Sequence, residues 1–337
     1  MNRSSPSPQT YQWSLVAFAG LCVALIYGQV ATDFLARKDV VPIVASASES
    51  EAHGARYGGR IKTVLQKPVT VQYLAPPLKL KAFFEQIGYR LDAVRRHGEV
   101  PRVFLAHFPE DLRQIEQPGD RKIIFIKTVL PLILRANEMI LQDRNIILAL
   151  RDRHEVGDTL TAFETRWLEA RAQEYGLEKL DFAALVRRVD IIPPSLALAQ
   201  AAEESGWGTS RFAREGNAIF GQRVWRGSNG MVPGRRDEGE TFRVRSYDQL
   251  IDGVMSYTRN LNGHSAYEDF RRAREKQKQS GKRPRGYELA LDLLSYSERG
   301  AKYLITIRKI MRVNGLHNFD KARLRHRRFV EAPSPDA

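Results

Sequence analysis

The sequence is poor in cysteine and in motifs that mark metal or cofactor chemistry. Its 337 residues contain one cysteine, Cys22, so no disulfide framework can form within the chain. The seven histidines are scattered without metal-site spacing. We find no Walker loop, dinucleotide fingerprint or G-x-S-x-G nucleophile elbow, and no repeat of about 20–50 residues. These absences predict a protein without a bound metal or cofactor.

Acidic residues are outnumbered by basic ones. There are 39 Asp and Glu against 53 Lys and Arg, a formal net charge of +14, which points to a polyanionic neighbour. Two basic runs stand out, "RRAREKQKQSGKRPRG" at 271–286 and "KARLRHRRF" at 321–329. Neither run has interleaved aromatic residues, so we expect a solvated loop and a flexible tail. The more specific alternative is that these runs contact anionic lipid or cell-wall polymer. No nucleic-acid partner is expected.

Charge is also missing from residues 13–30, "WSLVAFAGLCVALIYGQV", a run just long enough to cross a bilayer. The sequence that follows is a poor match to a signal-peptidase site, which favours an uncleaved anchor over a cleaved signal. We therefore predict a cytoplasmic tail at 1–12 and a transmembrane anchor or uncleaved signal at 13–30.

Helical periodicity dominates the rest of the chain. A stretch of small and polar residues, followed by an extended stretch that ends in two prolines, predicts a tether and linker at 31–77. We then expect a helical extension at 78–120, the main domain at 121–320 and a basic, flexible tail at 321–337. Within the main domain, residues 120–153 predict a buried core helix kinked at Pro131, and "TFRVRSY" at 241–247 predicts a short strand.

The strongest chemical signal lies at residues 199–222, "AQAAEESGWGTSRFAREGNAIFGQ". The helix over 194–204 is apolar nearly all round and is expected to be buried. It ends in Glu203 and Glu204 beside Trp207, although carboxylates there oppose the helix macrodipole. Partial burial raises the pKa of a carboxyl, as a general acid requires. The alternative, from the residues alone, is that both carboxylates are solvated.

This segment closely resembles the active-site segment of glucosaminidases of glycoside hydrolase family 73, and Bax-type proteins of Gram-negative bacteria are similar to it too. The likeness runs weakly over residues 120–316 and includes "YSERG" at 296–300. It implies a mainly α (α+β), lysozyme-like helical domain with a small β-lobe. It also implies cleavage of the β-1,4 bond after N-acetylglucosamine in peptidoglycan glycan strands. Glu204 matches the family's catalytic acid, and Glu203 is read as a bystander.

On this resemblance, residues 121–320 are the catalytic domain, held at the inner membrane and facing the periplasm. Glycosidases pair the acid with a second carboxylate, which family members often place in the β-lobe. The candidates, in order of preference within the lobe, are Glu240, Glu238 and Asp237, with Glu298 of "YSERG" as a further possibility. The acetamido group of the substrate is an alternative to all four.

Substrate-binding residues are expected to be mostly aromatic, because sugar rings stack on them. The candidates are Trp207, Tyr303, Phe220, Tyr296 and Tyr247, together with Asn217, which either holds a turn or contacts substrate. Tyr303 is the best match to a family tyrosine that lies near the acid.

Two other functions stay open. A muramidase or lytic transglycosylase also carries Glu-Ser-Gly, but here "NAIFGQ" replaces the Gly-Leu-Met-Gln type of segment and no Ala-Tyr-Asn-x-Gly segment is present. The other alternative is a membrane-tethered, cell-wall-binding scaffold that keeps the glutamate without turnover.

Overall fold

The computed structural model describes residues 80–225, 230–234 and 240–325. The chain divides into two compact units, Met1–Ala55 and Arg56–Ala337, and every described residue belongs to the second. The predicted anchor and tether lie outside the described residues, as does most of the C-terminal tail. Within the described ranges, no helix combines the length and the apolar character needed to cross a membrane.

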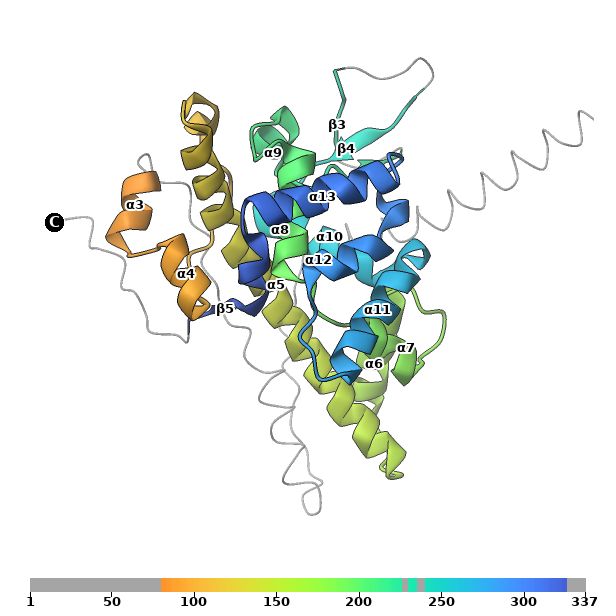
Figure 1. The fold of residues 1–337 in the computed structure, drawn as a ribbon. Coiled ribbons are helices and arrows are strands. Elements are labelled where there is room, and N and C mark those ends of the chain that lie inside the picture. Colours follow the sequence, from red (N-terminus) through yellow and green to blue (C-terminus); the bar gives the residue numbers. More distant parts are fainter. Residues whose placement is uncertain (1–79, 226–229, 235–239, 326–337) are drawn as a thin grey trace, which may run out of the picture. The chain divides into compact units, whose positions relative to one another are not determined.

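Helices dominate the described residues (Figure 1). The α-helices are α3 (Leu80–Gln86), α4 (Leu91–His97), α5 (Pro118–Glu155), α6 (Ala162–Glu174), α7 (Phe182–Arg188), α8 (Pro194–Ser205), α9 (Arg211–Gly216), α10 (Leu250–Gly263), α11 (Glu268–Gln279), α12 (Gly286–Leu289) and α13 (Ala301–Val313). Short 3₁₀ helices are η2 (Glu110–Gln114), η3 (Ser265–Tyr267), η4 (Ala290–Asp292), η5 (Leu294–Tyr296) and η6 (Leu316–Lys321).

Two small sheets complete the fold. Strand β1 (Glu99–Val100) pairs in parallel with β5 (Arg323–Leu324). The other sheet, which we call the β-lobe, has the antiparallel order β2 (Arg223–Val224), β4 (Arg243–Arg245), β3 (Gly230–Met231). In β4 the buried Val244 alternates with two exposed arginines, which confirms the predicted strand. The expected mainly helical class with a small β region is also confirmed.

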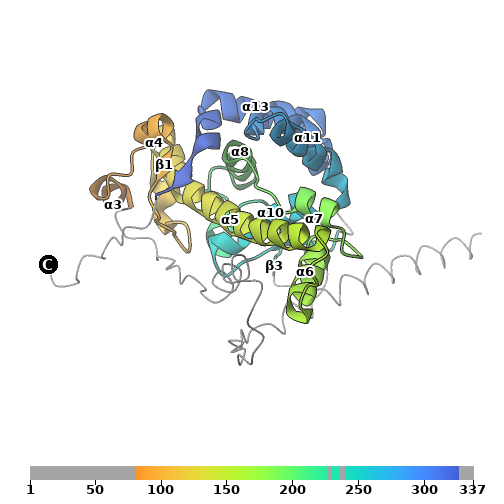
Figure 2. The same cartoon turned by 90° about the horizontal axis from the view of Figure 1, so that it is seen from below.

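The core is built along α5, a helix of 38 residues that continues through Pro131. Its residues 124–137 are buried without exception, as predicted for a core helix. Figure 2 shows α5 running past α8, α10 and α7, and it contacts all three. Helices α3 and α4 pack on the same hydrophobic core, and the predicted domain boundary at residue 120 falls in the first turn of α5.

Helix α8 lies among α5, α12, α13 and η6 and is buried along almost its whole length (Figures 1 and 2). Pro194 starts the helix, where a missing N–H costs nothing. The Asp320 carboxylate of η6 accepts hydrogen bonds from the Ser195 N–H and hydroxyl, both at 2.9 Å, and from the Gly286 N–H at 3.0 Å. A negative charge at this end also suits the helix dipole. The first turn of α8 is therefore firmly held.

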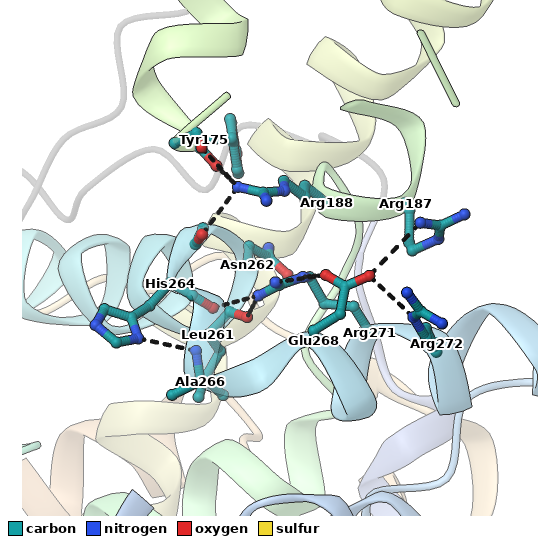
Figure 3. Close-up of polar contacts among 12 residues, drawn as sticks. Tyr175, Arg187, Arg188, Leu261, Asn262, His264, Ala266, Glu268, Arg271 and Arg272 are labelled. Carbon is teal, nitrogen blue, oxygen red and sulfur yellow. Dashed lines mark hydrogen bonds and ion pairs between the residues drawn. The ribbon is translucent and has the colours of Figure 1, made fainter. Parts of the chain in front are cut away.

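Arginines tie together the ends of several helices away from α8 (Figure 3). The Arg188 guanidinium donates to the carbonyls of Gly176, after α6, and Gly263, at the end of α10, both at 3.0 Å. Arg271 of α11 donates to the Leu261 and His264 carbonyls at 3.0 and 2.7 Å. Helix C-termini leave carbonyls without intrahelical partners, and a guanidinium fork satisfies several at once.

Arg274 extends this arrangement to α7. Its side chain is 1% exposed, and it donates to the Arg187 carbonyl at 2.8 Å, the Ile191 carbonyl at 2.9 Å and Oδ1 of Asn262 at 2.7 Å. Burial lowers the pKa of Arg274 to about 10, so it remains charged at neutral pH. The positive charge is compensated by Asp190, which also raises that pKa.

The expectation of a solvated loop at 271–286 is therefore wrong for its first part. This part is helix α11, and Arg271 and Arg274 point inward with at most 1% of their surface exposed. These two residues are unavailable to lipid or cell-wall polymer. Charged side chains are rarely buried, but here the two guanidinium groups satisfy helix-end carbonyls.

We expect Arg274→Met to lower the free energy of unfolding by about 3 kcal/mol, because buried carbonyls lose their donors. Arg272→Met is the matched control, since the Arg272 side chain is 68% exposed and forms an ion pair with Glu268 at the surface. The control should cost no more than about 0.5 kcal/mol. Urea unfolding measures both, and equal losses would show that the buried hydrogen bonds do not stabilise the fold.

Candidate active site

Glu204 sits in the last turn of α8, and the chain turns sharply after it. Gly206, Trp207 and Gly208 all have positive φ, at 57°, 59° and 79°. A Cβ at Gly208 would lie 2.9 Å from Cδ2 of Leu112, so glycine is required there for space as well as for conformation. The Gly208 N–H donates to the Ser205 hydroxyl at 2.9 Å. The Ser-Gly-Trp-Gly motif thus ends the helix directly after the carboxylate.

Burial raises the pKa of the Glu204 carboxyl above its ordinary value. A hydrogen bond from the Tyr303 hydroxyl lowers the pKa, the charge of Glu203 raises it and the charge of Arg299 lowers it. Glu203 itself is paired with Arg299, whose Nη1 lies 2.6 Å from Oε1 of Glu203. The effects of Glu203 and Arg299 on Glu204 are opposite in sign, so burial remains the main cause of the raised pKa.

Two residues that the sequence did not single out complete the surroundings of Glu204. Gln200 is one helical turn before Glu204 and fully buried, and its Nε2 donates to the Tyr303 hydroxyl at 3.2 Å. The Tyr257 hydroxyl of α10 donates to Oε1 of Gln200 at 2.8 Å. Gln200 could have been identified from the sequence, because it is a polar residue within a mostly apolar helix, four positions before the acid. No comparable sequence pattern marks Tyr257.

Several aromatic rings pack around Tyr303, the tyrosine next to Glu204. Tyr303 stacks on Tyr296 with ring centroids 5.4 Å apart, and Phe220 stacks on Tyr257 at 3.8 Å. Tyr257 and Tyr296 meet edge to face at 6.5 Å. Phe220 is 5% exposed and Tyr303 2%, so both rings are held mainly by packing against their neighbours. The structure thus brings Tyr303, Tyr296 and Phe220 of the predicted set together.

The remaining predicted aromatic residue of the motif, Trp207, has different contacts. Its ring meets that of Phe125 edge to face at 5.5 Å, and the Lys122 ammonium lies 5.0 Å from its centroid. Both partners belong to α5, so the half-buried indole packs against the long helix.

Asn217 and Tyr247 hold the base of the β-lobe. Asn217 is 4% exposed with φ 52°, and its Nδ2 donates to the carbonyls of Tyr247 at 2.9 Å and Asp248 at 3.1 Å. Asn217 therefore holds a turn, one of its two expected roles. The Tyr247 hydroxyl donates to Oε1 of Gln222, in the motif "NAIFGQ".

The glycine of this motif comes close to the acid. Gly221 has φ 59°, and a Cβ placed on it would lie 3.7 Å from Oε2 of Glu204. The segment that enters the β-lobe thus passes directly beside the carboxylate. This contact explains why the two halves of the motif, separated in sequence, belong to one site.

Only two of the four candidates for the second carboxylate can be located. Glu298 is exposed and forms an ion pair with Arg223 of β2, at 3.1 Å. Glu240 is exposed and lies just before β4. Asp237 and Glu238 lie outside the described residues. Over the described ranges, no three His, Cys, Asp or Glu side chains are grouped to hold a metal ion.

Comparison with known proteins places the site within a recognised domain. The sequence model of the family "Mannosyl-glycoprotein endo-beta-N-acetylglucosaminidase" matches residues 180–316, which include every residue of the site described above except those of α5 and η2. Protein bax of Escherichia coli (strain K12) is 30% identical over 204 residues, covering 57% of this chain and 69% of the Escherichia coli protein.

A search of solved structures matches the catalytic domain of the autolysin Auto from Listeria monocytogenes. It is 16% identical, with a TM-score of 0.30, over 50% of this chain and 94% of the autolysin domain.

We expect Gly221→Ala to raise the pKa of Glu204 further, because the new methyl group displaces water from Oε2. Gly281→Ala is the matched control, since Gly281 also has positive φ, 70°, but open space around it. Both should lose about 1 kcal/mol of stability from backbone strain. Carboxyl ¹³C NMR titration distinguishes them: only the Gly221 variant should move the Glu204 midpoint, and a shift of equal size in both would refute the contact.

Proposed function

The chain belongs to the family of Protein bax and is a glycoside hydrolase of the glucosaminidase type, and we propose that it cleaves the β-1,4 bond after N-acetylglucosamine in peptidoglycan, with Glu204 as the general acid. The observation that carries this proposal is the environment of Glu204. This carboxyl is at the end of a buried helix, and burial raises its pKa. It can therefore keep a proton at a pH where an exposed carboxyl has lost it.

In the proposed reaction, protonated Glu204 donates its proton to the glycosidic oxygen as the bond to the anomeric carbon breaks. The leaving sugar departs as an alcohol, and water then adds to the anomeric carbon. Positive charge develops on the sugar in the transition state, and a carboxylate or the substrate's acetamido group can stabilise it. Tyr303 holds the acid by its hydrogen bond, and Tyr296 and Phe220 support that arrangement through packing.

For the second carboxylate we propose Glu240 before Glu298. Glu298 pairs with Arg223 of β2 at the surface, with its side chain 87% exposed. Glu240 is exposed and immediately precedes the segment that leads into β4, and Glu238 and Asp237 stay candidates after it. Trp207 is proposed to extend the sugar-binding surface through its half-buried indole, and Tyr247 and Asn217 to fix the β-lobe beside it.

Two alternatives are tested by the same digestion. Mass spectrometry of muropeptides released from purified peptidoglycan identifies the new reducing end. N-acetylglucosamine at that end supports the proposal, and N-acetylmuramic acid or its anhydro form supports a muramidase or lytic transglycosylase. Intact strands bound without products support a scaffold.

We expect Glu204→Gln to lower the hydrolysis rate by about 10² to 10⁴, because the amide cannot donate the proton that general acid catalysis needs. Its melting temperature at pH 8 should stay equal or rise, since burial of the charged carboxylate destabilises the folded protein above the raised pKa. Glu203→Gln, which removes the ion pair with Arg299 and leaves the Glu204 carboxyl in place, is the control and should keep most of the activity. An inactive Glu203 variant with an active Glu204 variant would assign the acid to Glu203.

We further propose that residues 13–30 anchor the chain in the inner membrane, with the catalytic domain in the periplasm and peptidoglycan as its partner. Anionic lipid or polymer can contact only the exposed part of the basic runs, for example Lys276, Lys282 and Arg283.

A protein starting at residue 60 should stay in solution without detergent and keep its hydrolytic activity. Sedimentation of both forms after carbonate extraction tests this, and a full-length protein released by carbonate would contradict the anchor.

A further inference from the structure

A chain of hydrogen bonds leads from inside the protein to Tyr303, whose hydroxyl interacts with the Glu204 carboxyl. The Tyr257 hydroxyl donates to Oε1 of Gln200, and Nε2 of Gln200 donates to the Tyr303 hydroxyl oxygen. The Tyr303 hydroxyl in turn interacts with the Glu204 carboxyl and lowers its pKa. Gln200 and Tyr257 are both 0% exposed. Water therefore does not compete with these partners.

The chemistry of the groups gives the chain one direction. A carboxamide oxygen can only accept a hydrogen bond, and a carboxamide N–H can only donate one. Burial raises the pKa of Tyr257, so its hydroxyl keeps the proton that it donates to Oε1. Gln200 must then turn Nε2 toward Tyr303. The Tyr303 oxygen accepts this N–H, and its single proton is left for Glu204.

We propose that Gln200 and Tyr257 are positioning residues of the hydrolase, which hold the Tyr303 hydroxyl as a fixed donor to one oxygen of Glu204 and so place the acidic proton on the other oxygen. The inference rests on the proposed function, in which Glu204 is the general acid. Neither residue contacts the glycan in this role, since both act through Tyr303.

Removing the Tyr257 hydroxyl should change the titration of Glu204 in a defined direction. The Gln200 amide is then free to turn over and present Oε1 to Tyr303. While Glu204 is protonated, Tyr303 can donate to Gln200 instead. Once Glu204 is ionised, the charge-assisted hydrogen bond to the carboxylate is stronger and is kept. The added arrangement stabilises only the protonated form, so the pKa of Glu204 rises.

The test is Tyr257→Phe, with Tyr267→Phe as the matched control. Tyr267 is a buried tyrosine whose ring lies 6.1 Å from that of Tyr296, and its hydroxyl interacts with Asn260. We expect the alkaline limb of the pH profile of kcat/KM to move to higher pH in the Tyr257 variant only. Its kcat at the optimum should fall by about tenfold, because the acid is less well oriented. Carboxyl ¹³C NMR of Glu204 should show the same upward shift without any substrate.

A second substitution separates positioning from a general structural role. Gln200→Met keeps the length of the side chain but removes its hydrogen-bonding atoms. Added to Tyr257→Phe, it takes away the acceptor that competes for the Tyr303 proton. We expect the alkaline limb and the Glu204 midpoint of the double variant to return toward those of the wild-type protein. Replacing both buried partners by apolar groups is also well tolerated by the fold.

The inference is overturned if the Glu204 midpoint in the Tyr257 variant equals that of the wild-type protein and the Tyr267 control, or if the double variant shifts further instead of returning. These outcomes are independent of the proposed function. An inactive wild-type protein or a fully active Glu204→Gln variant refutes the function, whereas the NMR titration reads the hydrogen-bond chain in either case.

Discussion

A helix that is apolar nearly all round has to be covered on almost every side, and α8 imposes this constraint on the protein. Its small residues let α5, α12, α13 and η6 pack closely around it. Its two ends are fixed by different means: Asp320 binds the first turn, and the left-handed residues from Gly206 to Gly208 end the helix. A carboxylate in the last turn of such a helix cannot be fully hydrated. The position of Glu204 and its raised pKa both follow from this burial.

The two adjacent glutamates show that the surroundings of a side chain determine its role. Glu203 points toward Arg299 at the surface and has a compensating charge. Glu204 lies beside Tyr303 and Gly221, and the Tyr303 hydroxyl offsets only part of the rise in its pKa that burial causes. Identical side chains at consecutive positions thus receive a structural and a proposed catalytic role. Such a division between two carboxyls is a general means of obtaining an acid that works near neutral pH.

The features that could be predicted from the sequence depend on local patterns. The burial of α8 and α5, the strand at β4 and the special place of Glu204 follow from periodicity and from a contiguous motif. The partners supplied by distant segments could not be predicted. Tyr257 is hydrogen-bonded to Gln200, 57 residues before it in the sequence. Arg274 is hydrogen-bonded to the carbonyl of Arg187, 87 residues before it. No local pattern encodes such contacts, and a basic run such as that of α11 gives the opposite indication when its arginines are buried.

The central claim is that residue 204 faces the bond that breaks. A crystal structure of the Glu204→Gln variant with a peptidoglycan fragment bound would test this most directly, because the substitution keeps the shape of the side chain and stops turnover. The account predicts the glycosidic oxygen after N-acetylglucosamine within about 3 Å of the side-chain amide at position 204. A glycan that is bound with this oxygen against another carboxyl, and with position 204 covered by protein, would contradict it.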